Sequence, residues 1–337
     1  MIDNTLKRTL IETFVRKTLR DIKDSPERGI RNLVDMALNF SKGRFQTRFF
    51  QTAQRLLSNE HSAYYRLVRN IAQNIDHERL LRFGMNIGYN GCTLGAKRIR
   101  EIEAAEGFNI PWALFLEIDS RTFPERGDAY GALLRQGKEL GIYTWFLHAD
   151  EFADGLFDLM AGHEDCAFIL FCEPDGEFEQ VLDRAAGLNH LMLSIALEDR
   201  TEAACRRLRE REMLYAIHME YSPKNMKDIL NDNLLYDTQN MNATFTAFMP
   251  AENTTREERE ILYDYIVRKR EEQGFATILW ETVRDVLEID TVISDDGCSA
   301  GFRPDGSFFT LAGQRRDTDC NLFSSDLKDI LKRFLKK

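Results

Sequence analysis

The sequence predicts an α/β fold, a TIM-like partial (β/α)6 barrel with a helical bundle before it and a small extension after it. Two observations indicate this arrangement. Short apolar runs of strand length alternate with helical stretches between about residues 81 and 214, and strands that alternate with helices pair in parallel. Residues 5–74, by contrast, show helical periodicity alone. The 337 residues suffice for one large domain with appendages.

The first segment is expected to form about four helices packed as a bundle. Leu6, Leu10 and Phe14 begin an apolar stripe at the spacing of a helix with one buried face. Pro26 follows Ser25 and restarts the pattern, because proline fits the first turn of a helix behind a capping serine. We interpret the basic residues between the apolar positions as the solvated faces of these helices, with a nucleic-acid surface as the alternative.

The middle segment is expected to supply six strands and the helices between them. The strands are expected at residues 81–89, 110–118, 142–147, 167–172, 191–197 and 213–221, and the helices at 96–105, 130–140, 152–160, 178–186 and 202–211. Such a series can close into a barrel or open into a doubly wound sheet. We expect the barrel, because some strands keep small or polar residues on one face, which suits a crowded lumen. These residues are Gly84, Asn86, Gly88 and Asn90 in the first strand, and Ser194, Ala196 and Glu198 in the fifth.

The pattern becomes looser after the sixth strand. Further strands are expected at residues 243–249 and 275–279, with a helix at 255–273 between them. Pro304, Asp305 and Gly306 predict a hairpin turn, and a last amphipathic helix is expected at 326–335. The expected domains are therefore a helical bundle at residues 1–78, a barrel at 79–285, and a hairpin with a helix at 286–337.

Charge and composition exclude several classes of protein. The net charge is −10, from 45 basic and 55 acidic side chains, which disfavours binding to a phosphate backbone. No apolar run reaches the roughly 18 residues of a membrane span, and the polar start is no secretory signal, so we expect a cytoplasmic protein. The six cysteines form no C-x-x-C pair, so reduced thiols are expected rather than a disulfide framework or a zinc ribbon.

The carboxyl-terminal segment has a distinctive motif. It runs Cys-Ser-Ala-Gly-Phe-Arg-Pro-Asp-Gly-Ser-Phe-Phe from Cys298, and a second cysteine, Cys320, precedes the last helix. Together with the barrel pattern, this motif resembles the radical S-adenosylmethionine proteins that carry a SPASM-type tail. The resemblance covers roughly residues 81–336. It implies a partial (β/α)6 barrel followed by a cysteine-bearing extension with a Pro-Asp-Gly hairpin.

The sequence departs from that family at the position of its iron–sulfur cluster. The resemblance implies three closely spaced cysteines after the first strand, but residues 86–97 contain only Cys92. An iron–sulfur cluster needs several thiolates at one site, so we expect neither a cluster nor reductive cleavage of S-adenosylmethionine. The tail has only Cys298 and Cys320, which we expect to be buried thiols, with pairing or metal binding as the alternatives.

Polar residues gather where the expected strands end, which is the reactive face of a βα barrel. The candidate ligand-binding residues are Asn86, Asn90, Cys92, Glu117, Asp119, His148, Glu173, Glu198, His218 and Glu220. Strand alternation places Glu117 with Asp119, His148 with Asp150, and His218 with Glu220 on common faces, where they could converge on a polar ligand or a divalent metal. The alternative interpretation is that these acids cap the helices that follow. No catalytic residue and no metal ligand is assigned.

The glycine-rich stretch at residues 86–95 has two interpretations. Its backbone amides could approach a phosphate or carboxylate at the start of a helix, or it could form a tight turn. Cys92 would gain thiolate character if it lay at the amino end of that helix.

The leading hypothesis is a cluster-deficient radical-SAM-like barrel protein that binds a small ligand or a peptide at the carboxyl-terminal face of the barrel, in a non-radical binding or accessory role. The first alternative is a metal-dependent barrel enzyme that uses the carboxylates and histidines for hydrolysis or isomerisation. The second is a protein-interaction scaffold that acts through the basic helices. The sequence leaves open whether the protein is an enzyme. No membrane and no nucleic-acid partner is expected.

Overall fold

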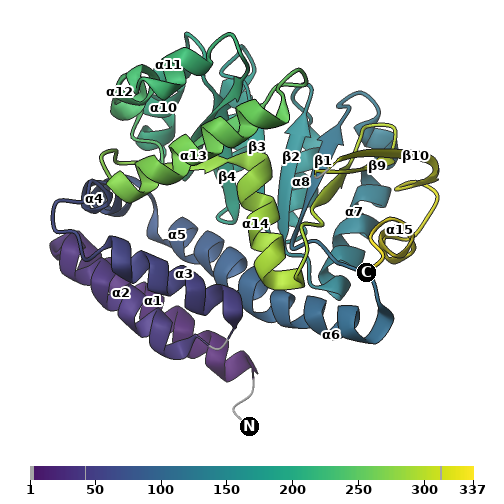
Figure 1. Cartoon of the computed structure of the whole chain (residues 1–337), viewed down its shortest axis with the longest axis horizontal. Helices are drawn as coiled ribbons and strands as arrows, with labels where there is room; N and C mark the ends of the chain where they lie inside the picture. Colours follow the sequence, from purple (N-terminus) through teal and green to yellow (C-terminus); the bar gives the residue numbers. More distant parts are fainter. Residues whose placement is uncertain (1–3, 42, 312) are drawn as a thin grey trace. The chain divides into compact units, whose positions relative to one another are not determined.

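The computed structural model describes residues 4–41, 43–311 and 313–337, with the backbone alone for residues 4, 5, 23, 24, 40 and 313–320 (Figure 1). The chain forms two compact units. The first unit comprises Met1–Lys42, Gln46–Leu81 and Ser194–Asp285, and the second comprises Gly43–Phe45, Arg82–Leu193 and Val286–Lys337. Among the described residues, no helix has both the length and the apolar character needed to span a membrane.

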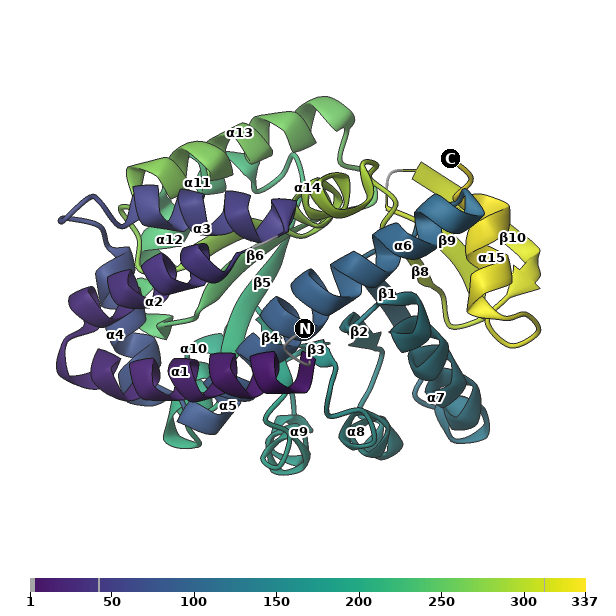
Figure 2. The same ribbon diagram turned by 90° about the horizontal axis from the view of Figure 1, so that it is seen from below.

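Helices occupy the beginning of the chain, as the apolar periodicity predicts. They are α1 (Asn4–Asp24), α2 (Pro26–Phe40), α3 (Arg44–Leu56), α4 (Tyr64–Asn74) and α5 (His77–Met85). In the first unit α1, α2 and α4 contact one another (Figure 2). Val34, Leu57 and Tyr65 form a small core there, and Arg31 donates a hydrogen bond to the Tyr65 hydroxyl at 2.7 Å. Pro26 begins α2, as expected.

The sheet of the first unit has parallel strands in the order β4-β5-β6-β7, and β4 crosses the boundary between the units. The strands are β4 (Leu191–Ala196), β5 (Tyr215–Tyr221), β6 (Phe245–Pro250) and β7 (Ile278–Glu281). Its helices are α10 (Thr201–Glu210), α11 (Met226–Leu230), α12 (Asn233–Thr238), the 3-10 helix Gln239–Met241 and α13 (Arg256–Glu272). One face of this sheet contributes Tyr221, Phe248 and Leu279 to a core with Leu262 and Ile266 of α13.

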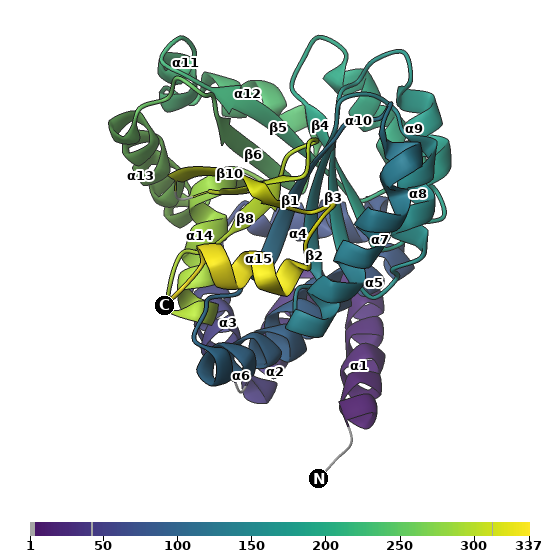
Figure 3. The ribbon, with the colours of Figure 1, turned by 90° about the vertical axis from the view of Figure 1, so that its right-hand side faces the viewer.

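The second unit has the strand order β10-β9-β8-β1-β2-β3-β4. Its strands are β1 (Ala113–Ile118), β2 (Thr144–Ala149), β3 (Ala167–Cys172), β8 (Ala300–Phe302), β9 (Ser307–Thr310) and β10 (Gly313–Asn321). Its helices are a π-helix (Asn86–Gly95), α6 (Ala96–Glu106), α7 (Phe123–Leu140), α8 (Asp154–Ala161), α9 (Phe178–Ala185) and α15 (Leu327–Phe334). Helix α14 (Thr282–Ser294) crosses the unit boundary. Helices α7 and α15 lie side by side in this unit (Figure 3).

The prediction of a first strand at residues 81–89 is wrong. The chain is α-helical to Met85 and π-helical from Asn86. The buried residues Leu81, Met85, Tyr89, Cys92 and Ala96 recur at helical spacing, and Asn86 and Asn90, four residues apart, are also buried; Phe83 is a further buried residue, and it alone suggests a strand. The first strand is therefore Ala113–Ile118, and the loop after it begins at Asp119 rather than in the stretch 86–97.

The other expected strands are confirmed, with ends that differ by a few residues. The hairpin is also confirmed, because β8 and β9 pair antiparallel and the Arg303 amide donates to the Ser307 carbonyl at 2.9 Å. Gly306 has φ +82°, the left-handed conformation that a glycine adopts without strain. Helix α14 and strand β10 were not anticipated. The division at residues 78 and 285 stays a prediction.

Candidate functional site

The sheet of the second unit has two unlike faces. Leu114, Trp145 and Phe168 lie on a fully buried outer face. Trp145 packs against α7, because a Cβ atom on Gly137 would lie 2.5 Å from its ring. Figure 2 shows α7, α8 and α9 in a row beside β1, β2 and β3. The alternate residues of these strands form the opposite, inner face, whose members are partly exposed at the carboxyl ends of the strands.

Aromatic rings cover the inner face. Phe115 of β1 is in register with Phe146 of β2, and their rings stack with centroids 4.4 Å apart and planes 6° apart. Phe146 also stacks on Phe171 of β3, at 6.3 Å. Phe115 is the partly exposed member of the three. We call Phe115, Phe146 and Phe171 the aromatic floor. It is an apolar surface on which a flat ring of a ligand could lie.

Glycine is required where this floor meets the hairpin. A Cβ atom on Gly301 of β8 would lie 2.5 Å from the Phe115 carbonyl oxygen and 2.6 Å from the Phe309 ring. Only a residue without a side chain therefore lets Phe309 of β9 lie across β8. Phe309 extends the aromatic floor to the edge formed by the hairpin.

Three polar side chains, Arg303, Glu117 and His148, follow the aromatic floor at the carboxyl ends of β8, β1 and β2. We call them the charged row. Arg303 Nη1 donates to Glu117 Oε2 at 2.9 Å and to Oε1 at 3.1 Å, and its guanidinium lies over the Phe309 ring at 5.1 Å. Glu117 is in register with His148, so the two side chains share the inner face on neighbouring strands. His148 is exposed.

The acidic residues just beyond the strands have local backbone partners. Asp119 accepts a hydrogen bond from the Arg121 amide at 3.0 Å, and Asp150 accepts one from the Ser120 amide at 2.8 Å. Desolvation opposes ionisation of Asp150, but the hydrogen bonds from backbone amides hold its pKa below the ordinary value. These bonds close turns in the loops and do not cap helices, because the N-cap of α7 is Thr122 and that of α8 is Ala153, so the capping interpretation is wrong for Asp119 and Asp150. Glu173 follows β3 and is exposed.

The remaining candidates of the barrel ends belong to the first unit. His218 and Glu220 lie two residues apart on β5 and so share a face of that strand. His218 Nδ1 lies 3.1 Å from the Ser194 hydroxyl of β4. Glu198 is exposed after β4, and its backbone amide donates to the Thr201 hydroxyl.

Asn86 and Asn90 lie elsewhere than expected. They are buried in the π-helix, where Asn86 donates to the Cys166 carbonyl at 2.6 Å and Asn90 to the Asp165 carbonyl at 2.8 Å. These carbonyls precede β3, so both amides serve the amino end of a strand, and their expected place at a carboxyl end is wrong. Cys92 is buried too, and desolvation raises its pKa to about 12, which contradicts the expected thiolate character.

The sequence interpretation missed Arg303 and the aromatic floor. The sequence pattern predicts a turn at Pro304, Asp305 and Gly306 but gives the neighbouring Arg303 no role, because a three-residue strand such as β8 gives almost no periodic signal. One signal in the sequence could have revealed the aromatic floor. Phe115 and Glu117 lie two residues apart, which marks one face of β1 as both aromatic and charged.

No group of three or more His, Cys, Asp or Glu side chains that could hold a metal is found among residues 4–41, 43–311 and 313–337. The described cysteines Cys92, Cys166, Cys172, Cys205 and Cys298 form no disulfide. The side chain of Cys320 lies outside the described residues, so the expectations for Cys320 remain predictions.

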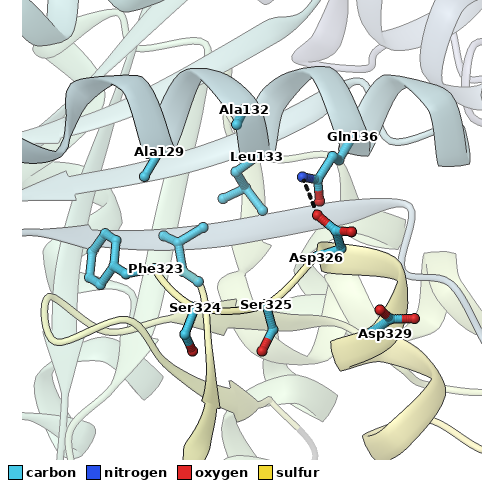
Figure 4. Close-up of a pocket in the computed structure, with 10 residues that line it drawn as sticks. Ala129, Ala132, Leu133, Gln136, Phe323, Ser324, Ser325, Asp326 and Asp329 are labelled. Atoms are coloured by element: carbon cyan, nitrogen blue, oxygen red, sulfur yellow. Dashed lines mark hydrogen bonds between the residues drawn. The ribbon is translucent and has the colours of Figure 1, made fainter.

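A separate hollow of about 490 Å³ lies between α7 and the loop before α15 (Figure 4). Its walls include Ala132, Leu133 and Phe323. Gln136 crosses its rim, because its side-chain amide donates to Asp326 Oδ1 at 3.1 Å and accepts from the Leu327 amide at 2.6 Å. These hydrogen bonds attach the start of α15 to α7.

A buried carboxyl group lies under β1. Asp290 of α14 accepts hydrogen bonds from the Trp112 amide at 3.0 Å and from the Ser299 hydroxyl, and burial raises its pKa to about 7. An unfolded aspartate titrates near 3.9. Between these values the folded state binds a proton that the unfolded state releases, so the contribution of Asp290 to stability falls as the pH rises.

Replacing Asp290 with asparagine should remove this pH dependence. We expect the free energy of unfolding of Asp290→Asn, relative to the wild type, to rise by about 3 kcal/mol between pH 4.5 and 8, since one pKa unit corresponds to about 1.4 kcal/mol. Urea unfolding of both proteins at the two pH values measures this difference. A difference that stays constant with pH would show that the carboxyl group titrates normally.

Comparisons with known proteins identify the fold. No family model and no curated protein matches the sequence. A crystal structure of SuiB from Streptococcus suis bound to S-adenosylmethionine matches with a TM-score of 0.50 and 12% identity, over 70% of this chain and 66% of SuiB. Another crystal structure of SuiB aligns with a TM-score of 0.48 and 12% identity over 95% of this chain and 81% of that one.

The class of fold follows from the first match. The chain has an α/β fold with a mostly parallel sheet, consistent with a partial TIM-like barrel. This chain therefore shares its fold with the SuiB structure that is bound to S-adenosylmethionine. The chain spans just under two thirds of that SuiB structure, and the likeness is one of fold.

Proposed function

We propose that this protein uses a radical-SAM-like scaffold without an iron–sulfur cluster, to bind a small ligand at the carboxyl ends of β8, β1 and β2. The ligand joins a flat ring to charged groups, and the role is binding or accessory rather than radical catalysis. The observation that carries the proposal is the charged row at the end of the aromatic floor.

The two parts of the site suit the two parts of such a ligand. The ring of Phe115, the partly exposed one, offers a stacking surface for a flat ring, because aromatic pairs gain energy beyond their buried area. In the charged row, Arg303 and His148 are donors and Glu117 is an acceptor. Each lies one strand spacing from its neighbour in the row, so together they orient the ligand. S-adenosylmethionine joins a flat ring to charged groups, and it is the ligand of the matched SuiB structure.

The cysteines support the absence of a cluster. No cysteine occurs between Cys92 and Cys166, a stretch that contains β1 and the whole loop after it. Desolvation raises the pKa of Cys92, Cys166 and Cys205 to about 12, and it raises that of Cys172 and Cys298 as well. An iron–sulfur cluster needs several cysteine thiolates at one site, and the residues that the structure describes include no group of three potential metal ligands. This donor set does not fit an iron–sulfur cluster.

The proposed organisation retains three segments: helices at residues 1–78, a barrel at 79–285 and a reduced SPASM-type hairpin with a helix at 286–337. The resemblance of the Cys298 motif to that tail supports the last segment. We propose a cytoplasmic location for the protein and a small molecule or a peptide as its partner.

Titration of iron-free protein with S-adenosylmethionine in a calorimeter tests the proposal. We expect binding by the wild type and about fivefold weaker binding by His148→Ala, the cost of roughly one hydrogen bond. His61→Ala is the matched control, because His61 is also exposed but lies in the first unit, between α3 and α4. A wild type that does not bind, or equal affinities for His148→Ala and His61→Ala, would refute the proposed site.

A further inference from the structure

We propose that Arg303 is an oxyanion receptor, which binds a carboxylate or phosphate group of the ligand. This inference rests on the proposed function, since it names the chemical class of ligand for the same site. It is carried by the way the guanidinium is fixed on two sides and left without a partner on a third.

The backbone that carries Arg303 is anchored. Arg126 of α7 donates from Nη1 to the Pro304 carbonyl at 2.5 Å, and its guanidinium lies over the Phe323 ring at 4.3 Å. The backbone of Arg303 is also fixed by the hairpin hydrogen bond that its amide donates to the Ser307 carbonyl. Arg303 therefore projects from a braced turn, which lowers the entropy that its side chain loses when it binds a ligand.

The guanidinium itself is fixed by two neighbours. Glu117 binds it through Nη1 alone, and the Phe309 ring lies against its plane. Gly301 makes this stacking possible, because any side chain there would collide with Phe309. A guanidinium held in this way presents its remaining N–H groups in one direction.

Those remaining groups have no partner in the protein. Nε and Nη2 of Arg303 donate no hydrogen bond to any residue that the structure describes, and Nε is buried. A buried donor without an acceptor is destabilising, and a ligand oxygen that accepted its hydrogen bond would remove that cost. The side chain is 27% exposed and Nη2 is not among the buried unpaired atoms, so a ligand oxygen can reach Nη2 directly, whereas it reaches the buried Nε only if neighbouring side chains move aside.

The geometry of this edge selects the ligand group. Nε and Nη2 donate in parallel, and two such N–H groups match the two oxygens of a carboxylate or a phosphate. His148 adds a ring N–H as a further donor, since it lies next to Glu117 in the register. A neutral carbonyl oxygen accepts such hydrogen bonds without the charge that strengthens them, and a cation is repelled by the guanidinium. The structure therefore points to an oxyanion.

Inorganic phosphate and sodium acetate are suitable probes, titrated separately into the full-length protein at constant ionic strength with chloride. We expect at least one of them to bind at a single site, and the stronger of the two identifies a phosphate or a carboxylate as the natural group. Arg303→Lys keeps the positive charge but loses the fork, so its affinity should fall by about tenfold or more.

Arg121→Lys is the matched control. Arg121 follows β1, is 81% exposed and pairs with Asp119 at 3.5 Å. This substitution should leave anion affinity unchanged. Absence of binding by the wild type, or equal affinities of Arg303→Lys and Arg121→Lys, would overturn the inference.

If Arg303→Lys does not fold, Glu117→Gln takes its place. Loss of the neighbouring negative charge should tighten anion binding by about threefold. Unchanged or weaker binding by Glu117→Gln would overturn the inference.

The titration with S-adenosylmethionine and the titration with anions distinguish failure of the proposed function from failure of the oxyanion receptor. Binding of S-adenosylmethionine without phosphate or acetate binding would leave the proposed function intact and refute the oxyanion receptor. Binding of an oxyanion lost in Arg303→Lys, without binding of S-adenosylmethionine, would support the receptor and refute the proposed function as tested.

Discussion

Replacing Arg270 with glutamine is expected to lower the free energy of unfolding by about 3–5 kcal/mol, the usual cost of removing one partner from a buried ion pair. Arg270 of α13 donates to Asp285 from Nη1 at 2.9 Å and from Nη2, and its Nε donates to the Leu279 carbonyl at 2.7 Å. The side chain of Asp285 is 7% exposed, and it also accepts from the Glu281 amide. Arg270 thus joins α13, β7 and α14 within the first unit.

The control for this substitution lies on the same helix. Arg268 is 63% exposed and pairs only loosely with Glu272, at 3.7 Å. Exposed pairs contribute about 0–1 kcal/mol, so Arg268→Gln should change stability little. Urea unfolding measures both variants. The double variant Arg270→Gln with Asp285→Asn should lose less than the sum of the single losses, because the two groups are coupled. Equal stabilities of Arg268→Gln and Arg270→Gln would contradict the importance of the buried pair.

Gly95→Ala is expected to destabilise the second unit by about 3 kcal/mol or more, in the upper range for overpacking. A Cβ atom on Gly95 would collide with the Gly141 carbonyl oxygen and lie 2.9 Å from that of Asn90. Both obstacles are backbone atoms, which cannot swing aside as a side chain can. Gly141, at φ +103°, ends α7 in the left-handed conformation and cannot accommodate the added methyl group without shifting that helix end.

Gly88 provides the matched control in the same π-helix. It is exposed, and a Cβ atom there would meet nothing within 4 Å. Gly88→Ala should therefore leave the melting temperature unchanged or raise it slightly, because alanine loses less backbone entropy. Thermal unfolding followed by circular dichroism compares the two. A Gly95→Ala protein as stable as Gly88→Ala would show that the contact between the two glycines is looser than described.

Most of the elements of this fold are predictable from local sequence. The run 167–172 is apolar throughout and occupies strand β3 at those bounds. Short continuous apolar runs are typical of parallel strands buried on both faces, and they separate well from the longer helical stripes. Strands β1 to β7 are identified in this way, although their ends differ by a few residues.

The error at residues 81–89 has a physical explanation. Apolar residues at Leu81, Phe83 and Met85 fit a period of two, whereas Leu81, Met85 and Tyr89 fit a helix. Both patterns are present in a short window, and only the contacts of the folded chain decide between them. Asn86 and Asn90 satisfy carbonyls about 75–80 residues away, a tertiary role that no local pattern reveals.

The candidate site could be predicted in part. Glu117 and His148 follow from their positions at the ends of β1 and β2. Their partner Arg303 is 186 residues from Glu117, and it reaches the site only because β8 pairs in parallel with β1. Strand order depends on nonlocal packing, so the charged row as a unit was not visible in the sequence.

The central proposal is that a radical-SAM-like scaffold works here without an iron–sulfur cluster. Iron and acid-labile sulfide analysis tests it most directly, on protein purified without oxygen, reconstituted with iron and sulfide, and freed of unbound metal. We predict no stoichiometric iron or sulfide, and no broad visible absorbance. A [4Fe-4S] cluster bound in stoichiometric amount would contradict the account.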